Sequence, residues 1–252
     1  MKAVAIVPAA GRGERLGPGT PKALRALAGV PMLVRAVHSL AQAPSVDLVV
    51  VVAPPGSEAE VRALLPEDQL GAAVSVVAGG PTRQQSVRLG LSALPEWAEV
   101  VLVHDAARPL VPLELVDAVV RAVSAGADAV VPALPVSDTV KAVDAHEWVT
   151  GTLDRAALRS VQTPQGFRRL VLEQAHAKAA DGPQDSTDDA GLVERLGVPV
   201  QVIAGHEEAF KVTRPIDLVL AEALVARRRP ETGWRPETGW LSDTGRRPET
   251  DR

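Results

Sequence analysis

The stretch AVAIVPAAGRGERLGPGTPK, residues 3–22, decides which fold and which kind of ligand this sequence predicts. Its first five residues are apolar, which is typical of a buried β-strand. The strand runs directly into a glycine-rich loop that also carries Arg12, Arg15 and Lys22. Glycines let backbone N–H groups approach and face a ligand, and the cations favour a ligand with several negative charges. The stretch therefore predicts a polyphosphate site at the end of the first strand.

Two familiar phosphate loops do not fit this stretch. A Walker A loop needs a Gly-Lys pair, and the sequence contains none. A dinucleotide loop needs Gly-x-Gly-x-x-Gly, but Leu16 stands where the third glycine belongs and Gly17 comes one position late. A tight turn of small residues would explain a Gly-x-Gly pair alone. The added Arg15 and Pro21-Lys22 favour nucleotide binding instead.

Composition narrows the class of protein. The chain has 252 residues, 46% of them hydrophobic, a net charge of −4 and no cysteine. This charge argues against a duplex nucleic acid partner, and the lack of cysteine excludes disulfides and thiolate catalysis. No apolar run approaches the ~20 residues of a membrane span. We therefore expect a cytoplasmic protein with neither a nucleic acid nor a membrane partner.

Short Val/Ile/Leu-rich runs alternate along the chain with longer helical patterns. The expected strands cover 3–7, 48–53, 74–78, 100–104, 129–132 and 200–204. The expected helices cover 32–43, 57–65, 83–94, 113–124, 168–180, 188–196 and 216–227. Continuously apolar strands are buried on both faces, which predicts a mostly parallel sheet between two layers of helices. In such Rossmann-like folds, ligands bind beyond the carboxyl ends of the strands.

Two segments stand apart from this alternation. Residues 138–144 and 148–153 predict a β-hairpin around a polar turn, and such a hairpin needs a surface to pack on, such as a second subunit. Residues 229–252 form four polar six-residue units, RPETGW, RPETGW, LSDTGR and RPETDR. We interpret this tail as disordered, with a binding tail through Trp234 and Trp240 as the alternative.

Two motifs should emerge where strands end. In His104-Asp105-Ala106-Ala107-Arg108-Pro109, Asp105 is suited to hold Mg²⁺ or a substrate hydroxyl, and Arg108 to clamp a phosphate. The alternative is an internal Asp–Arg ion pair that closes a turn. The small polar residues of 79–86, GGPTRQQS, are suited to read a base edge, while Thr82 is equally suited to cap a helix.

Two further motifs lie near the C-terminal end. Lys211, in KVTRP, is either a point charge for phosphate or a solvated loop lysine. The acidic segment 185–190, DSTDDA, predicts a helix start capped by Ser186 or Thr187, and a metal site is the alternative.

These motifs, taken in their order along the chain, resemble those of the 2-C-methyl-D-erythritol 4-phosphate cytidylyltransferase family. The matching pieces are PAAGxGxR at 8–15, PK at 21–22, VHDAARP at 103–109, DTVK at 138–141, TPQxF at 163–167, TDDA at 187–190 and KVTRP at 211–215. One departure is Ala23, where the family often has glutamine. The resemblance implies a three-layer nucleotidyltransferase domain over 1–228, with 136–155 as a dimerisation arm and 229–252 as a separate tail.

The resemblance also implies roles for individual residues. The CTP-binding residues would be Ala9, Ala10, Gly11, Gly13, Arg15, Lys22, Gly80 and Ser86. The substrate-binding residues would be Asp105, Arg108, Thr139, Arg155, Thr163, Thr187 and Lys211, with Thr139 and Arg155 supplied by the partner of a homodimer. Arg15, Lys22, Arg155 and Lys211 would be catalytic, and Mg²⁺ would be the cofactor, with its ligands left open.

The implied reaction transfers a cytidylyl group from CTP to 2-C-methyl-D-erythritol 4-phosphate and releases pyrophosphate. A cytidylyltransferase for another polyol phosphate, such as ribitol 5-phosphate, would share nearly every motif. A catalytically inactive nucleotide-binding regulator is the alternative from a different class, but such a protein would be expected to lose Arg15, Lys22, Arg155 and Lys211.

Overall fold

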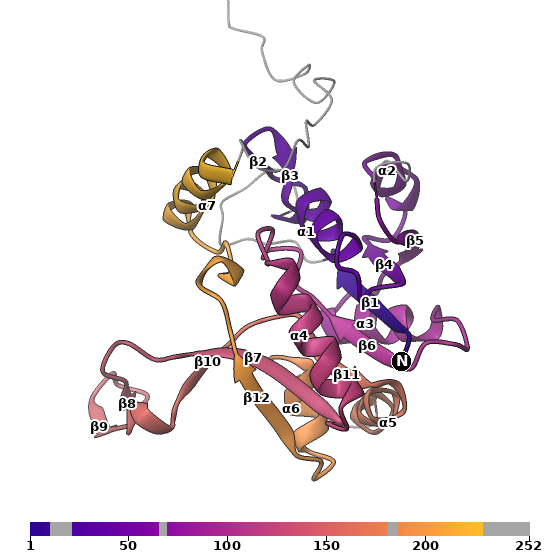
Figure 1. Ribbon diagram of the computed structural model, residues 1–252. Helices are drawn as coiled ribbons and strands as arrows, with labels where there is room; N and C mark the ends of the chain where they lie inside the picture. The colour runs from indigo at the N-terminus through magenta and orange to yellow at the C-terminus, as the bar shows by residue number, and fades with distance from the viewer. Residues whose placement is uncertain (11–21, 66–69, 181–185, 229–252) are drawn as a thin grey trace, which may run out of the picture.

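The computed structural model describes residues 1–10, 22–65, 70–180 and 186–228, and it is built around an eight-stranded sheet (Figure 1). The strand order is β10-β7-β11-β6-β1-β4-β5, and β12 also pairs with β7. These strands are β1 (Ala3–Pro8), β4 (Leu48–Ala53), β5 (Ala73–Ala78), β6 (Val100–Val103), β7 (Ala129–Pro135), β10 (Arg159–Val161), β11 (Gln165–Arg168) and β12 (Val200–Ala204). The six predicted strands are confirmed, with small shifts at their ends.

The centre of the sheet is parallel and buried on both faces, as predicted. Ile6 of β1 lies opposite Val50 of β4 on one side and Val103 of β6 on the other, in parallel register. Alternate residues of β1 enter different hydrophobic clusters, because side chains along a strand point to opposite faces: Ala5 joins one cluster and Ile6 the other.

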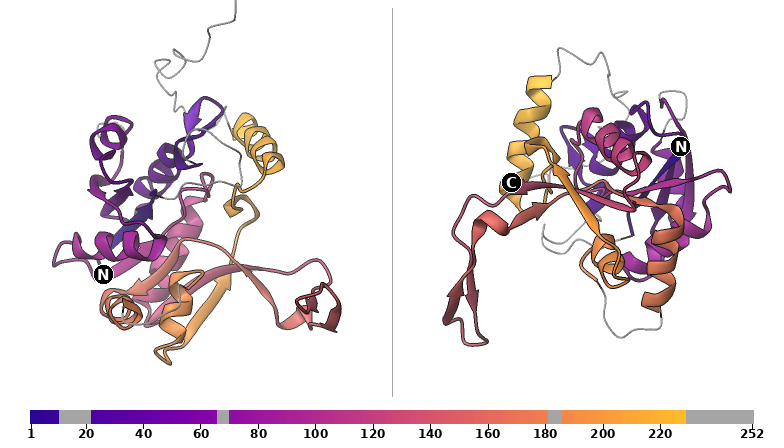
Figure 2. Two further views of the ribbon diagram at one scale, coloured as in Figure 1. Left: turned by 180° about the vertical axis from the view of Figure 1, so that it is seen from behind. Right: turned by 60° about the horizontal axis from the view of Figure 1, so that its bottom comes forward.

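Helices cover both faces and complete the three-layer α/β fold (Figures 1 and 2). The α-helices are α1 (Met32–Ala41), α2 (Glu58–Ala63), α3 (Arg83–Ser92), α4 (Leu113–Ser124), α5 (Arg169–Ala180), α6 (Asp189–Glu194) and α7 (Pro215–Arg228). The apolar residues of α1 and α4 share one cluster with the sheet, and those of α3, α5 and α6 share the other. No described helix is both long and apolar enough to cross a membrane.

Four short strands were not predicted: a separate antiparallel pair, β2 (Ala26–Leu27) and β3 (Val30–Pro31), and two strands of the main sheet, β10 and β11. β11 lies between β6 and β7 and runs antiparallel to both, and β10 pairs antiparallel with β7. The helix predicted over 168–180 is confirmed as α5, with its start shifted by one residue because Arg168 ends β11. Gly166 allows this insertion, since a Cβ at that position would lie 2.4 Å from Cγ1 of Val119 on α4.

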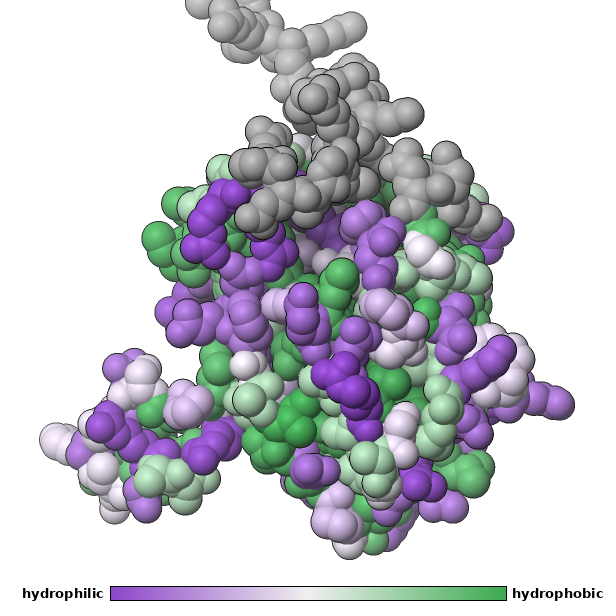
Figure 3. All heavy atoms as spheres, in the orientation of Figure 1, coloured by the Kyte–Doolittle hydropathy of each residue, from purple (hydrophilic) through white to green (hydrophobic). Residues whose placement is uncertain are grey.

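The predicted hairpin is confirmed as a separate two-stranded sheet of β8 (Lys141–Val143) and β9 (Val149–Thr152). Both strands are shorter than expected, and the ladder contains an irregularity between Ala142 and Val143. The hairpin projects from the body as an arm (Figures 1 and 2), and its surface mixes hydrophilic and hydrophobic residues (Figure 3). The predicted tail, 229–252, lies outside the described residues.

Candidate functional site at the carboxyl edge of the sheet

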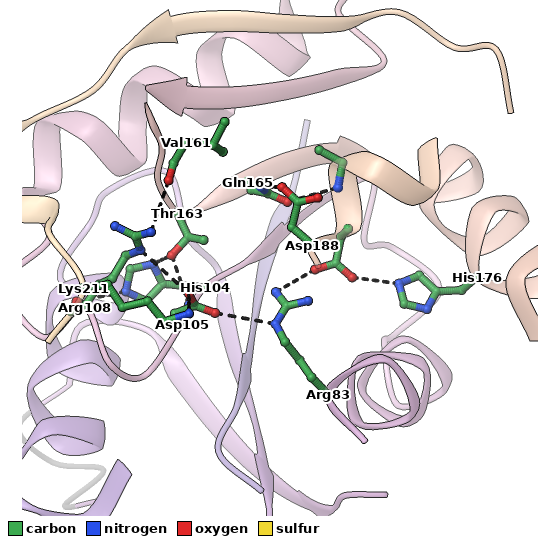
Figure 4. A network of polar contacts seen from close by, with 12 residues as sticks. Arg83, His104, Asp105, Arg108, Val161, Thr163, Gln165, His176, Asp188 and Lys211 are labelled. Carbon is green, nitrogen blue, oxygen red and sulfur yellow. Dashed lines mark hydrogen bonds and ion pairs between the residues drawn. The ribbon is translucent and has the colours of Figure 1, made fainter. Parts of the chain in front are cut away.

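Asp105 is the centre of a charged cluster at the edge where the parallel strands end (Figure 4). The buried strand β6 delivers it to this edge, as the sequence predicts. Its Oδ2 lies 2.9 Å from Nζ of Lys211 and 3.8 Å from Nε of Arg108, and its Oδ1 lies 3.6 Å from Nε of Arg83. Three cations from three separate parts of the chain therefore surround one carboxylate.

These cations keep Asp105 ionised. Burial raises the pKa of the carboxyl group, because only 13% of the side chain is exposed, but the attraction of Arg83, Lys211 and Arg108 outweighs this effect. The resulting pKa lies well below the usual range of an aspartate. At neutral pH Asp105 is a hydrogen-bond acceptor only, suited to receive hydroxyl groups.

Lys211 reaches this cluster from the loop that precedes α7. The backbone N–H of Val212 donates to the carbonyl oxygen of Ala107 at 2.8 Å, which ties this loop to the loop that carries Asp105. The Lys211 side chain is 39% exposed, so it pairs with Asp105 while still facing solvent. Lys211 is therefore a loop lysine that is both solvent-facing and paired with Asp105 at the edge of the sheet, and its role toward phosphate stays a prediction.

Arg108 is more deeply held than the sequence suggests. Its guanidinium donates to the carbonyl oxygens of Ala209 at 2.7 Å and Val161 at 3.3 Å, and the whole residue is buried. The backbone N–H of Arg108 also donates to the carbonyl oxygen of Asp105, which closes a turn. The alternative of an internal Asp–Arg pair therefore describes Arg108 well, although Asp105 itself has further partners.

A neutral histidine holds this turn in place. His104 is fully buried, with Nε2 3.1 Å from the carbonyl oxygen of Arg108 and Nδ1 3.0 Å from Oγ1 of Thr163. Burial lowers the pKa of His104 to about 4, so the ring is neutral at pH 7. Because a carbonyl oxygen only accepts, Nε2 carries the proton, and the Thr163 hydroxyl donates to Nδ1. Oγ1 of Thr163 also accepts the N–H of Asp105 at 3.1 Å.

The loop 79–82 lies beside the end of β1 and brings several predicted CTP-binding residues together. The N–H groups of Ala9 and Gly79 donate to the carbonyl oxygens of Val52 and Ala53, at 2.8 and 2.7 Å. A Cβ on Gly79 would lie 3.0 Å from Cβ of Ala10, so the two segments are closely apposed. Ala9, Ala10 and the glycine loop therefore share one edge.

Thr82 caps α3, as predicted. It forms a reciprocal capping box with Gln85 at the start of the helix. Ser86 is fully buried, and its hydroxyl accepts the N–H of Gly80 at 3.2 Å and lies 2.9 Å from the carbonyl oxygen of Thr82. The Ser86 side chain therefore shapes the loop, and Gly80 supplies backbone groups beside it.

The acidic segment before α6 is a helix start, but its cap differs from the expectation. Asp188 is the capping residue, because Oδ1 accepts the N–H of Gly191 at 3.0 Å, so the expected cap by Ser186 or Thr187 is wrong. The other oxygen of Asp188 accepts from Nε2 of Gln165 at 2.7 Å. Thr187 is exposed. In the described residues no group of three or more His, Cys, Asp or Glu side chains is placed to hold a metal.

Three residues outside the predicted set complete the cluster. Arg83, the first residue of α3, also contacts Asp189 of α6, with NH2 2.8 Å from Oδ2. Oδ1 of Asp189 lies 2.9 Å from Nε2 of His176, and both side chains are buried. Arg83 and Asp189 stand within the quoted motifs GGPTRQQS and DSTDDA, whereas nothing in the sequence around His176 marks it.

Arg155 and Thr139 have no printed contact with this cluster within the described part of the chain. Arg155, in the short helix η4 (Arg155–Ala157), is exposed and donates to the carbonyl oxygen of Ser137 at 2.6 Å. Thr139 is also exposed near the base of the arm. Lys22 opens the short helix η2 (Lys22–Leu24). Gly11, Gly13 and Arg15 lie outside the described residues.

The three-layer fold, with a cluster of cations at the carboxyl edge of its sheet, agrees with the nucleotidyltransferase class, to which the comparisons assign the chain. A family model described as IspD, 2-C-methyl-D-erythritol 4-phosphate cytidylyltransferase, matches residues 3–227. The chain therefore belongs to the 2-C-methyl-D-erythritol 4-phosphate cytidylyltransferase family, and it is an enzyme of the cytidylyltransferase type.

Individual relatives agree with this assignment. A 2-C-methyl-D-erythritol 4-phosphate cytidylyltransferase from Streptomyces coelicolor is 58% identical over 92% of this chain and 88% of its own length. The crystal structure of a protein of the same name from Thermus thermophilus is 40% identical, with a TM-score of 0.72 over 90% of this chain and 100% of that one. A 4-diphosphocytidyl-2C-methyl-D-erythritol synthase from Anaerococcus prevotii reaches a TM-score of 0.78 at 27% identity, covering 90% of this chain and 96% of that one.

Proposed function

We propose that this chain transfers the cytidylyl group of CTP to 2-C-methyl-D-erythritol 4-phosphate. The products would be pyrophosphate and the CDP-linked methylerythritol of non-mevalonate isoprenoid precursor synthesis. The observation that carries this proposal is the ionised carboxylate of Asp105 with Lys211 beside it at 2.9 Å, at the edge formed by Ala9, Ala10 and Gly80. The printed names of the relatives support the choice of both substrates.

In the proposed reaction, a phosphate oxygen of the polyol phosphate attacks the α-phosphorus of CTP in line. The bond from the α-phosphorus to the oxygen bridging it to the β-phosphate breaks, and pyrophosphate leaves. Both reactants are anions, so positioning and charge neutralisation carry the catalysis. A phosphate monoester is largely ionised at pH 7, so the step needs neither a strong general base nor a covalent nucleophile.

We assign the charges to the two ends of the reaction. Arg15 and Lys22 would stabilise the α-phosphate and the departing pyrophosphate. Lys211 would place the incoming phosphate: an ammonium has three N–H donors, so the contact with one oxygen of Asp105 leaves donors for a phosphate. Asp105 would accept hydrogen bonds from the polyol hydroxyls.

The remaining residues would hold the two substrates. The CTP triphosphate and base would lie against Ala9, Ala10, Gly11, Gly13, Gly80 and Ser86. The carbonyl oxygen of Gly80 is suited to meet the base, because it can accept a second hydrogen bond, whereas the Gly80 N–H and the Ser86 hydroxyl already bond within the loop. Thr163 and Thr187 would line the polyol side, with Arg108 holding Asp105 and its loop in place.

Mg²⁺ is the cofactor we propose. The described part of the chain has no cage of three or more metal-ligating side chains, so the protein alone would hold the ion weakly. This fits Mg²⁺ carried mainly by the substrate phosphates, while Asp105, already paired with three cations, serves the polyol hydroxyls. When bound, the ion would neutralise charge on the triphosphate.

We further propose a cytoplasmic homodimer in which the arm of one subunit completes the site of the other. Thr139 and Arg155 belong to the arm and its base, and neither contacts the Asp105 cluster of its own chain in the described contacts. Exposed apolar side chains on the arm, among them Trp148 and Val149, offer a surface for a partner. Arg155 from the partner would join Lys211 at the incoming phosphate.

Pyrophosphate release tests the proposal directly. The purified chain would be assayed with CTP and Mg²⁺, and with either 2-C-methyl-D-erythritol 4-phosphate or ribitol 5-phosphate. We expect turnover with the first polyol and little with the second. A preference for ribitol 5-phosphate would contradict the substrate assignment. CTP binding by calorimetry without turnover of either polyol would instead indicate a nucleotide-binding regulator.

A further inference from the structure

Arg83 is the single residue that joins the Asp105 cluster to a second buried carboxylate among the described contacts (Figure 4). Its Nε faces Oδ1 of Asp105 at 3.6 Å, and its NH2 nitrogen pairs with Oδ2 of Asp189 at 2.8 Å. A guanidinium is planar and presents several donors in fixed directions, so one arginine can bridge two carboxylates. Arg83 thereby links the start of α3 to the loop after β6 and to α6.

The Asp189 end of this bridge is buried and paired on both carboxylate oxygens. The Asp189 side chain is almost completely buried, and Nε2 of the equally buried His176 lies 2.9 Å from its other oxygen. Burial raises the pKa of Asp189, but the hydrogen bond from His176 and the charge of Arg83 outweigh burial and lower it. If Arg83 moved away, the buried carboxylate of Asp189 would lose its charged partner, which is energetically costly. The contact with Asp189 therefore holds the guanidinium of Arg83 in its place.

At its other end, Arg83 affects the orientation of the Asp105 carboxylate, which is proposed to bind the polyol phosphate. Lys211 and Arg108 face one oxygen of Asp105, and Arg83 alone faces the other in the described contacts. Without Arg83, the carboxylate would be attracted from one side only and would turn toward Lys211. The ammonium of Lys211 would then be more fully neutralised and less available to a phosphate.

The neighbouring glycine loop does not depend on the Arg83 side chain. That loop is held by the hydrogen bond between Gly80 and Ser86 and by the capping box of Thr82 and Gln85. Loss of the guanidinium should therefore disturb the polyol phosphate side of the site and leave the cytosine side in place.

We infer that Arg83 is a positioning residue for the polyol phosphate. Held by the Asp189–His176 pair, it orients the carboxylate of Asp105 and so keeps Lys211 available to the incoming phosphate. This inference rests on the proposed function, because it assumes that Asp105 and Lys211 bind the polyol phosphate.

The first experiment compares Arg83→Gln with Arg88→Gln, an exposed arginine on the same helix. Steady-state pyrophosphate release would be measured while each substrate is varied in turn. For Arg83→Gln we expect kcat/KM for the polyol phosphate to fall about 10- to 100-fold, the loss that follows from misplacing a substrate by roughly 1 Å. We expect KM for CTP to change less than about 3-fold, because the glycine loop is intact. Arg88→Gln should match the wild type in both constants.

A second set of variants separates positioning from folding. Arg83→Lys keeps one positive charge but cannot bridge two carboxylates, so we expect it to recover part of the activity lost in Arg83→Gln. Asp189→Asn should lower the same kcat/KM, and the double variant Arg83→Gln/Asp189→Asn should lose no more than Arg83→Gln alone. Thermal melting of every variant identifies any that fail to fold, and Arg83→Lys, which removes no charge, keeps the test valid if Asp189→Asn does not fold.

Three results would overturn the inference. The first is an equal kcat/KM for the polyol phosphate in Arg83→Gln and Arg88→Gln. The second is a rise in KM in Arg83→Gln that is the same for CTP and the polyol phosphate. The third is a loss in the double variant that equals the sum of the two single losses. A wild-type protein that turns over neither polyol would instead refute the proposed function and, with it, this inference. The two failures are thus distinguished by the activity of the wild type.

Discussion

The charged edge around Asp105 and the projecting arm differ in how each is held. At the edge, Asp105 contacts three cations, and its side chain is only 13% exposed. On the arm, Trp148 is 73% exposed, and contacts within the hairpin, such as that of Lys141 with Thr152, stabilise it. The edge is shaped by contacts within one chain, whereas the arm exposes apolar surface that only an outside partner can bury.

The proposed second subunit would cover the apolar surface that the arm exposes. A short hairpin is marginally stable alone, and Val143, Trp148 and Val149 stay 48%, 73% and 59% exposed in this chain. The edge, by contrast, is pre-organised before any ligand arrives. Substitutions at the edge should therefore change the catalytic rate, whereas substitutions on the arm should change the affinity between the proposed subunits.

The largest effect is expected from Lys211→Ala at the edge. An oriented charge at the transition state contributes ~3 kcal/mol, so turnover should fall about 100-fold. Folding should be little affected, because Asp105 keeps Arg83 and Arg108 as partners. Pyrophosphate release and thermal melting measure the two quantities. Lys178→Ala, an exposed lysine on α5, is the control and should be fully active. Wild-type turnover in Lys211→Ala would contradict the role proposed for the edge.

The next effect is a loss of stability in mild acid. Burial lowers the pKa of His104 from 6.5 to about 4, so the unfolded chain takes up this proton more readily than the folded one. The neutral His104 ring therefore contributes its full stabilisation of the folded state above pH 6.5, and this contribution is lost as the pH falls toward 4. By pH 5 the free energy of unfolding should be lower by about 2 kcal/mol, roughly 30-fold in the folding equilibrium. The lowered pKa of Asp105 acts only below its ordinary value of 3.8, outside this range.

Urea unfolding at pH 7.5 and pH 5 measures this loss. His104→Gln should remove most of the difference between the two pH values, while His146→Gln, an exposed histidine of the arm, should leave it unchanged. His38, whose pKa burial also lowers, contributes equally in all three proteins. An unchanged pH dependence in His104→Gln would show that the buried ring is not the source.

A mixture of two inactive variants tests whether the arm completes the site of its partner. We expect Arg155→Ala and Lys22→Ala to retain about 1% of activity each, by the same reasoning about oriented charge. If Arg155 acts across the interface, each mixed dimer holds one intact site, and an equal mixture should recover about a quarter of wild-type activity. No recovery, with mixed dimers detected by native mass spectrometry, would place Arg155 in the site of its own subunit.

The smallest expected effect is on dimer affinity. Trp148→Ser removes the most exposed large apolar side chain of the arm, and the dissociation constant of the dimer should rise about 10-fold. Activity of the fully dimeric protein should change little. Sedimentation at several concentrations measures the constant, and Leu170→Ser on α5, also strongly exposed, is the control. If the control weakened the dimer and Trp148→Ser did not, the interface would lie on the body of the protein.

The sequence predicted the sheet centre and much of the site because these depend on local patterns. Continuous apolar runs predict buried parallel strands, and the strand ends place Asp105 and Lys211 at one edge. β11 could not be predicted in this way, because its four residues include Gly166 and Arg168 and are not an apolar run. Its place between β6 and β7 depends on pairing with strands far away in the sequence.

The charge bridge of Arg83 was also beyond the reach of sequence patterns. Asp189 stands 106 positions after Arg83 in the sequence, and His176 lies on a third helix. Similarly, the sequence suggested Ser186 or Thr187 as the cap of α6, whereas contacts with Gln165 and Gly191 select Asp188.

By itself, the sequence determined the layered fold and the family, since apolar periodicity and motif spacing are written along the chain. Only the tertiary structure decided which charges face one another. Which partner a charged side chain finds depends on how distant segments pack, and here packing turned one oxygen of Asp105 toward Lys211 and the other toward Arg83.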